Sequence, residues 1–161
     1  MTIGGRLTIA ALSLLALGGC TIATPFKGPG FDPKEGVTLE GPDRVVVAIT
    51  RAVLQGDRSE RSDFWTNVWR VEASLEARQG FIGYSLRREL FGAEAWTMTA
   101  WIDESSLDAF VSSSVHQTAI EQSLPALGQT GFARFEVERD DIPLSWDRAV
   151  EILEEDGRHY D

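Results

Sequence analysis

The chain has 161 residues, of which 43% are hydrophobic and 25% are charged, and its formal net charge is −10. These values are typical of a globular protein with one domain-sized core. The acidic balance, together with the lack of any run of Lys and Arg, argues against nucleic acid or an anionic membrane surface as a partner held by basic patches.

The first twenty residues differ in kind from the rest of the chain. Arg6 is their only charged residue, and residues 7–17 form an apolar run of signal-peptide length, too short to cross a bilayer comfortably. Small residues then precede Cys20, the only cysteine. This pattern resembles the bacterial lipoprotein signal, in which the cysteine is acylated and becomes the mature N-terminus. A plain signal peptide with an incidental cysteine, or a short membrane anchor, remain as alternatives.

The lipoprotein resemblance implies an exported domain in the bacterial cell envelope, anchored to the membrane through Cys20. Several acyl chains anchor a protein stably where one does not. With Cys20 modified, no cysteine is left for a disulfide, so the core alone must hold the domain. Residues 21–42 contain four prolines, four glycines and no apolar periodicity, which predicts a poorly ordered tether.

Residues 43–140 are predicted to form the folded domain. Residues 43–54 are rich in β-branched side chains and predict a buried strand. Over residues 59–78, apolar side chains recur at three- and four-residue spacing, which predicts an amphipathic helix that ends at Gly80. Residues 81–90 and 94–103 predict two strands joined by a hairpin turn.

A second helix is predicted from Asp103 onward, because capping and acidic residues suit a helix start. Residues 125–131 are predicted as a loop, and the alternation in residues 132–138 predicts a fourth strand. Residues 141–161 are predicted to hold a short amphipathic helix, over 145–155, and an acidic tail. The predicted order is therefore β-α-β-β-α-β with an extra C-terminal helix.

This order is that of an α+β, ferredoxin-like fold: one antiparallel sheet with both main helices on one face. The other face would then be uncovered, and Val45 and Val47 would belong to a large exposed apolar patch. A second copy of the chain is the simple way to cover it, which predicts a homodimer.

Three stretches resemble antibiotic biosynthesis monooxygenase (ABM) domains of the dimeric α/β barrel superfamily. These are GFIGY at residues 80–84, WTMTAW at residues 96–101, and the segment from Ala109 to His116. The resemblance covers about residues 44–137 and implies a homodimer whose sheets face each other. It also implies a pocket between each sheet and its two main helices.

Members of that superfamily include cofactor-free monooxygenases of aromatic polyketides and haem-degrading enzymes. The haem-degrading relatives use a Trp and a later His on the second helix. Counted forward from Trp101, these places hold Phe110 and Ile120, so haem degradation is not expected and no cofactor is predicted. Activity inferred from fold alone is weak support for chemistry.

His116 is the candidate catalytic residue, because imidazole can act as a base or a hydrogen-bond donor near neutral pH. On an unbroken helix it lies opposite Leu107, away from the buried stripe, which favours a surface position. A break at residues 112–114, a run of three serines, would turn it inward. Neither a second histidine nor a cysteine clusters with it, so no metal site is predicted.

Six further residues are candidates for substrate binding. Aromatic side chains stack on flat aromatic ligands, but at helix and strand positions they more often belong to the core. A tyrosine and an arginine suit a phenolic or carboxylate substrate, although Arg88 has acidic neighbours in the hairpin with which to pair. The six are Trp65, Trp69, Tyr84, Arg88, Trp101 and Phe110.

Two functional hypotheses follow. The first is an exported, membrane-tethered ABM-like domain that binds a hydrophobic or aromatic small molecule and oxidises it without a cofactor. The second is a non-catalytic envelope lipoprotein that uses the fold for dimerisation or ligand binding. An open, polar-lined pocket under the second helix favours the first hypothesis, and a pocket filled by Trp65, Trp69 and Phe110 favours the second.

Overall fold

The structure is a computed structural model that describes residues 20–160. The predicted signal peptide lies outside these residues except for Cys20, which is exposed. Among the described residues, no helix is both long and apolar enough to cross a membrane. The elements are β1 (Thr21–Ala23), β2 (Phe31–Asp32), β3 (Gly36–Val37), β4 (Arg44–Leu54), α1 (Arg58–Leu75), β5 (Phe81–Glu89), β6 (Glu94–Trp101), α2 (Glu104–Val111), α3 (Ser114–Ser123), the 3₁₀ helix η1 (Leu124–Ala126), β7 (Leu127–Glu138), the 3₁₀ helix η2 (Arg139–Asp141), α4 (Trp146–Asp156) and β8 (Arg158–Tyr160).

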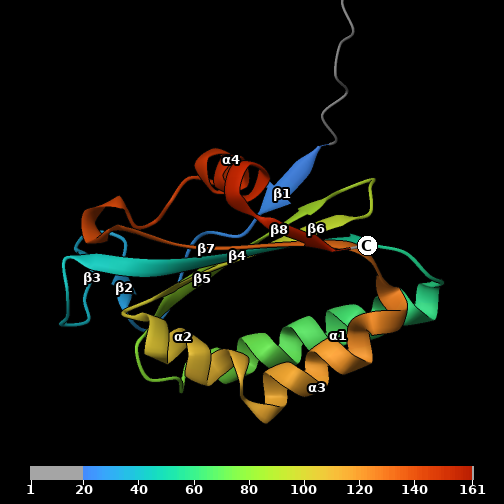
Figure 1. The fold of residues 1–161 in the computed structure, drawn as a ribbon, viewed down its shortest axis with the longest axis horizontal. Helices are drawn as coiled ribbons and strands as arrows, with labels where there is room; N and C mark the ends of the chain where they lie inside the picture. Colours follow the sequence, from blue (N-terminus) through green and yellow to red (C-terminus); the bar gives the residue numbers. More distant parts are fainter. Residues whose placement is uncertain (1–19, 161) are drawn as a thin grey trace, which may run out of the picture.

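The main sheet is antiparallel, with strand order β1-β5-β6-β4-β7-β8. Helices α1, α2 and α3 cover one face, here called the helix-side face, and α4 lies on the other, the α4-side face (Figure 1). The predicted ferredoxin-like order, with an antiparallel sheet and an extra C-terminal helix, is confirmed. Buried β-branched residues of β4 form the centre of the sheet, as the composition of that stretch predicts.

The predicted first helix is confirmed as α1, and Asp57 caps its start. The Asp57 carboxylate accepts hydrogen bonds from the backbone N–H groups of Ser59 and Glu60, and the Glu60 carboxylate accepts one from Asp57 N–H in return. This reciprocal capping box satisfies backbone donors that have no partner within the helix. Gly80, at φ +72°, follows the helix in the left-handed conformation that glycine adopts without strain.

The expectation that residues 21–42 form a poorly ordered tether is wrong. Strand β1 pairs with β5, Lys27 exchanges two backbone hydrogen bonds with Tyr84, and Gly30 N–H donates to Ile82 at 3.0 Å. The physical reason is that β5 would otherwise present an unpaired edge, which the N-terminal segment satisfies. A segment without apolar periodicity can still be ordered when a neighbouring strand provides partners for its backbone hydrogen bonds.

The expectation of an exposed apolar sheet face is also wrong. Val45, Val47 and Ile49 have no exposed surface. Helix α4 covers them with Trp146, Ala149 and Leu153, and the N-terminal segment covers them with Phe26, Phe31 and Leu39. A dimer with the two sheets face to face would require these elements to leave. The homodimer therefore stays a prediction, and its interface would have to be formed by a different surface of the chain.

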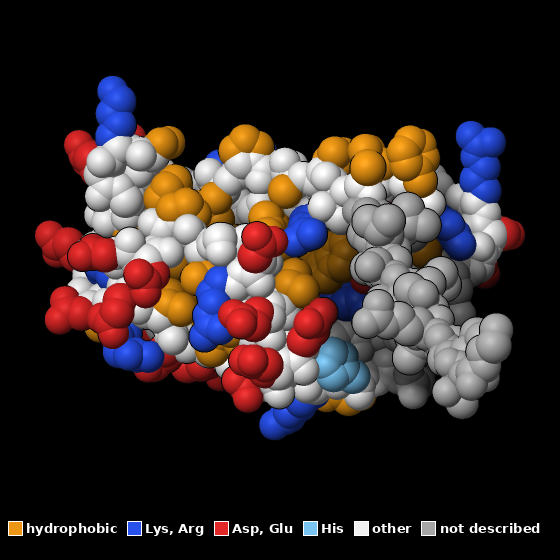
Figure 2. Space-filling model, turned by 90° about the horizontal axis from the view of Figure 1, so that it is seen from above, with side chains coloured by type: hydrophobic (Ala, Val, Ile, Leu, Met, Phe, Trp, Pro, Cys, Tyr) orange, Lys and Arg blue, Asp and Glu red, His pale blue; other side chains and the backbone are white. Residues whose placement is uncertain are grey.

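The outer side of α4 is acidic. Its exposed carboxylates gather over the middle of this face of the molecule (Figure 2). They are Asp147, Glu151, Glu154, Glu155 and Asp156. This charged surface covers the sheet face at which the family resemblance implies a partner subunit. Its charge favours contact with water at that place.

Two segments between the second helix and the fourth strand differ from expectation. The predicted single helix is two helices, because Ser112 and Ser113 interrupt it between α2 and α3. The predicted loop over 125–131 is mostly strand, because β7 begins at Leu127 and pairs with β4 up to Leu54. The glycines at 128 and 131 made this stretch look like a loop, yet β4 supplies its hydrogen bonds.

Candidate functional site

The helix-side face holds a continuous chain of aromatic rings. Trp101 of β6 lies between Phe81 and Phe110, with ring centroids 5.0 Å from each. Phe110 in turn contacts the ring of His116, with centroids 4.6 Å apart, and Phe81 stacks with Tyr84. The structure thus brings together four predicted site residues: Tyr84, Trp101, Phe110 and His116. Trp101 has no exposed surface and Phe110 is 6% exposed, so these two rings are part of the core.

His116 is turned inward by the interruption between the two helices. Ser113 caps α3 by accepting a hydrogen bond from His116 N–H, and the imidazole is half-buried. Its Nδ1 lies 3.1 Å from the carbonyl oxygen of Val111. A carbonyl can only accept, so Nδ1 carries the proton and Nε2 keeps a free lone pair.

The protonation state of His116 follows from its surroundings. Burial lowers the pKa of His116, the hydrogen bond to Val111 raises it, the charge of Arg78 lowers it, and the net direction is down. The imidazole is therefore neutral near pH 7. A neutral imidazole with a free Nε2 can accept a proton, which is the requirement for a general base.

Two rows of side chains cross the centre of the sheet beside the aromatic chain. In the cross-strand register, each of the strands β5, β6, β4 and β7 contributes one residue to each of two adjacent rows. Paired residues of antiparallel strands point to the same face, and both rows share the helix-side face. The rows are Leu86, Thr97, Thr50 and Phe132, and Tyr84, Thr99, Ala48 and Arg134.

These rows are not fully covered by the helices. Thr50, Thr97 and Thr99 lie on the two central strands, yet each is partly exposed, so the helix layer does not close over them. Trp101 Nε1 donates to Thr99 Oγ1 at 3.0 Å, which joins the rows to the aromatic chain. We call the two rows together with the chain of rings from Phe81 to His116 the helix-side site. Leu86, Phe132, His116 and the three threonines are the site's partly exposed side chains besides Arg134, so a ligand there would meet apolar groups and hydroxyls.

A hydrogen-bond network fixes Tyr84 at one end of the site. The Tyr84 hydroxyl donates a short hydrogen bond to Glu72 of α1, and Lys27 lies 3.4 Å from the same carboxylate oxygen. Burial raises the pKa of Tyr84, and the hydrogen bond to Glu72 raises it further. Tyr84 is therefore a protonated phenol at neutral pH. The hydrogen bond with Tyr84 and the pairing with Glu72 raise the pKa of Lys27.

Arg134 of β7 closes the other end. One of its nitrogens lies 2.6 Å from Glu104 and 2.7 Å from Asp108 of α2. Its Nε is buried and has no hydrogen-bond partner among the described residues. Burial lowers the pKa of Arg134, but Asp108 and Glu104 raise it and the net direction is up, so the side chain stays charged.

Sequence reasoning missed Glu72, Thr97, Thr99 and Arg134. The alternation of β6 and β7 would have placed the last three on one face of the sheet. Nothing in the sequence showed that this face stays partly open, since that depends on how far the helices stand from the sheet.

Trp65, Trp69 and Arg88 form a group of their own next to the helix-side site. The guanidinium of Arg88 sits over the ring of Trp65 at 5.8 Å, and the Trp65 and Trp69 rings are 6.1 Å apart. Trp69 is 54% exposed. These three residues form a group at the edge between α1 and β5, so neither tryptophan fills the space under the second helix.

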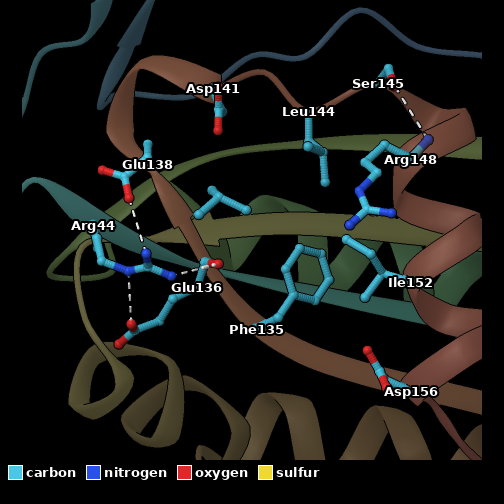
Figure 3. Close-up of a pocket in the computed structure, with 11 residues that line it drawn as sticks. Arg44, Phe135, Glu136, Glu138, Asp141, Leu144, Ser145, Arg148, Ile152 and Asp156 are labelled. Atoms are coloured by element: carbon cyan, nitrogen blue, oxygen red, sulfur yellow. Dashed lines mark hydrogen bonds and ion pairs between the residues drawn. The ribbon is translucent and has the colours of Figure 1, made fainter.

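A cavity of about 620 Å³ lies between β7 and α4, on the α4-side face (Figure 3). Its apolar wall includes Phe135, Leu144 and Ile152. Arg44 at its rim is held by Glu136 at 3.1 Å and Glu138 at 3.0 Å. None of the predicted site residues lines this cavity. Among residues 20–160, no three His, Cys, Asp or Glu side chains cluster in a way that could hold a metal ion.

Comparison with known proteins agrees with this architecture. Residues 44–122 match the family model described as "Antibiotic biosynthesis monooxygenase". A relative named spheroidene monooxygenase, from Rubrivivax gelatinosus, is 31% identical over 108 residues, which are 66% of this chain but only 38% of that protein. The chain therefore spans well under half the length of this relative.

Solved structures share the fold at low sequence identity. A conserved protein from Methanosarcina mazei superposes with a TM-score of 0.52 at 16% identity, covering 58% of this chain and 92% of that one. SnoaB, a cofactor-independent oxygenase from Streptomyces nogalater, superposes with a TM-score of 0.51 at 16% identity, covering 63% of this chain and 99% of that one. These likenesses show the fold alone. Over residues 44–122, just under half of its length, the chain is similar to the antibiotic biosynthesis monooxygenase family.

Proposed function

We propose that the protein is an envelope-anchored monooxygenase that binds a flat hydrophobic or aromatic molecule at the helix-side site and oxidises it without a bound cofactor. The observation that carries this proposal is the state of His116. It is a neutral imidazole with a free Nε2 at the end of the aromatic chain, which Trp101 links to partly exposed hydroxyls. A base beside an apolar, hydroxyl-lined surface suits proton abstraction from an activated C–H bond.

The comparisons support monooxygenation as the reaction class. A relative is named a monooxygenase of spheroidene, and a structural neighbour is titled a cofactor-independent oxygenase. Both names describe those proteins. For this chain they raise the expectation of oxygen chemistry, while the substrate is inferred from the character of the site.

The proposed reaction balances with dioxygen as the only oxidant. His116 Nε2 accepts a proton from an acidic CH₂ group, such as that of an anthrone, and leaves a delocalised carbanion. The carbanion reduces dioxygen, and the new C–O bond yields a peroxide whose O–O bond breaks as a second proton leaves carbon. The CH₂ group becomes a carbonyl, and the second oxygen atom leaves as water. Substrate carbanion stability supplies most of the rate, and the protein orients the substrate and excludes water.

The test is oxygen uptake with a panel of anthrones and quinols. We expect turnover of an anthrone with one dioxygen consumed per carbonyl formed, and a loss of about a hundredfold or more in His116→Ala, the usual size of a general-base contribution. His159→Ala is the matched control. This exposed histidine lies on the edge strand β8, on the sheet face opposite the helix-side site. Equal rates in the two variants would clear His116 of a catalytic role.

The alternative is a non-catalytic domain that only binds its ligand. The full burial of Trp101 and the near-complete burial of Phe110 favour it, because these rings fill space that a substrate would need. Under this alternative, a hydrophobic ligand quenches tryptophan fluorescence, but no panel compound supports oxygen uptake above the uncatalysed rate.

Anchoring through Cys20 is a separate part of the proposal. The apolar run before it, the small residues at 18 and 19 and its exposed position support acylation. Growth with a radioactive fatty acid should label the native chain and leave Cys20→Ala unlabelled. Equal labelling of both would reject Cys20 as the acylated residue.

A further inference from the structure

An exposed apolar surface lies beside Cys20. Phe91 is 94% exposed, and Ile22 and Leu90 are 44% and 43% exposed. Leu90 N–H donates to the carbonyl oxygen of Cys20 at 2.9 Å, and Ile22 pairs with Arg88. Alternate residues of a strand share a face, so Ile22 and Leu90 lie on the same face of the sheet, next to Cys20. We call Ile22, Leu90 and Phe91 the apolar tip.

The carboxylates of the hairpin are bound by groups of the protein. Glu89 accepts backbone hydrogen bonds from Ala93 at 3.0 Å and Glu94 at 3.2 Å. Glu94 is bound by Arg51 through two hydrogen bonds of 2.7 Å. These charges hold the turn in shape, and they do not offset the apolar character of Phe91.

The apolar tip continues into the group at the edge of α1. Arg88, opposite Ile22, stacks over Trp65, which contacts the exposed Trp69. Tryptophan and arginine side chains each have an apolar body and a polar end, and such side chains are typical of the water–lipid boundary.

We propose that the apolar tip inserts into the lipid bilayer at which Cys20 is anchored, with Trp65 and Trp69 at the headgroup level. This inference rests on the proposed placement of the chain at a membrane. Acylation of Cys20 and retention of the apolar run at residues 7–17 as an anchor both bring a bilayer to residue 20. Because β1 is hydrogen-bonded to β5, the anchor point cannot separate from the tip, and a bilayer at one must meet the other (Figure 1).

The membrane contact is apolar and not electrostatic. The chain carries a net charge of −10, and the outer side of α4 is acidic, so an anionic surface would repel it. The bilayer in the test is therefore zwitterionic phosphatidylcholine, and contact should survive high salt.

The test measures the depth of residue 91 in the bilayer. The full chain is purified from bacterial membranes, reconstituted into phosphatidylcholine vesicles and labelled with bimane at Phe91→Cys. Lys34→Cys, in the exposed turn between β2 and β3, is the matched control, and the native chain reports any label on Cys20. We expect doxyl-labelled lipid to quench bimane at residue 91 several-fold more strongly than at residue 34, and aqueous iodide to show the reverse order.

Each outcome decides between the two proposals. If the chain sediments with the vesicles but residues 91 and 34 are equally open to iodide, the insertion of the tip is rejected and the membrane anchor stands. If the chain does not sediment with vesicles, both the anchor and the insertion fail. Oxygen uptake by the reconstituted protein is independent of either result.

Discussion

Gly28 lies directly against Gly83, with no room between them for a side chain. A Cβ atom added to Gly28 would lie 2.3 Å from the Cα of Gly83, and one added to Gly83 would lie 2.6 Å from the ring of Phe26. This close approach allows the N-terminal segment to run along β5 and cover part of the α4-side face. Glycine is required here for space and not for an unusual backbone conformation.

Gly83→Ala should therefore loosen the N-terminal segment. Overpacking of this kind typically costs about 1–3 kcal/mol, since neither the Phe26 ring nor the backbone at Lys27 can move without breaking contacts. Chemical denaturation measures the loss, and faster proteolysis near residues 24–30 would locate it. Gly128→Ala is the control, because its Cβ would meet nothing closer than 3.2 Å. Equal stability of the two variants would contradict the close packing.

His116 should titrate below the usual histidine range. Burial lowers its pKa, so the folded protein holds this proton less tightly than the unfolded chain does. The free energy of unfolding should consequently fall as the pH is lowered from the unfolded value of about 6.5 to the depressed folded pKa, and then level off. His116→Gln should remove this part of the pH dependence.

Nuclear magnetic resonance can follow this titration directly, because the chain has only two histidines. His159→Gln leaves His116 as the single imidazole signal. If the catalytic proposal holds, the rate of anthrone oxidation should rise with pH through the same midpoint, as His116 loses its proton. A midpoint at or above the usual range would refute the neutral-base assignment.

Tyr84 should ionise above the usual range for a phenol. Burial raises its pKa and the hydrogen bond to Glu72 adds to the shift, so Glu72→Gln should lower the pKa without restoring the usual value. Absorbance at alkaline pH measures this in a Tyr160→Phe background, where Tyr84 is the only phenol. The associated stability is complete below the unfolded pKa of about 10 and is lost as the pH rises above it.

Tyr84→Phe checks the same contact without titration. The hydrogen bond joins a phenol to a carboxylate, and such bonds contribute about 1.5–3 kcal/mol. Ser74→Ala, which removes a hydroxyl bonded to the backbone within α1, is a comparison with a smaller expected loss. A Tyr84→Phe protein as stable as the native one would show that this pairing adds nothing.

Removal of α4 should make the protein self-associate. A chain that ends at Asp141 exposes Val45, Val47 and Ile49, which have no exposed surface when Ala149 and Leu153 cover them. An uncovered sheet face of this kind is an interaction surface. Sedimentation should show a larger average mass for the shortened chain than for the full chain at the same concentration.

A point substitution separates this effect from unfolding. Leu153→Ala keeps α4 but removes buried side-chain volume, which should cost about 2–5 kcal/mol without creating an open face. Glu154→Ala, one residue further along and exposed, should change stability by less than about 0.5 kcal/mol. A shortened chain that stays folded and does not associate would argue against the covering role of α4.

Periodicity predicted the central elements well and the peripheral ones poorly. The β-branched run of β4, the spacing in α1 and the alternation of β6 are local patterns, and each appeared where it was predicted. Strand β1 was missed because it is three residues long and precedes a stretch rich in proline and glycine, and the first part of β7 because its glycines indicate a loop. Both become strands only when a neighbouring edge provides hydrogen bonds, and that depends on residues far away in the sequence.

The candidate site divides in the same way. The three serines at residues 112–114 were visible in the sequence, but the sequence did not show whether they break the helix. An unbroken helix would have left His116 at the surface. Its contact with Phe110 and its hydrogen bond to Val111 decide its position and charge state. Trp65 and Trp69 were grouped with Trp101 by residue type, yet they lie on the outer edge of α1, since the face of a helix that meets the sheet is set by packing.

By itself, the sequence determined the order of the central strands and helices and the acidic balance, and it supplied the resemblance to a lipoprotein signal at Cys20. These depend on composition and on patterns a few residues long. Only the tertiary structure decided that α4 and the N-terminal segment bury the sheet face, that the His116 ring turns inward and that the apolar tip lies beside Cys20. Each of these depends on contacts between residues distant in the chain, whose energies compete and cannot be read from any one segment.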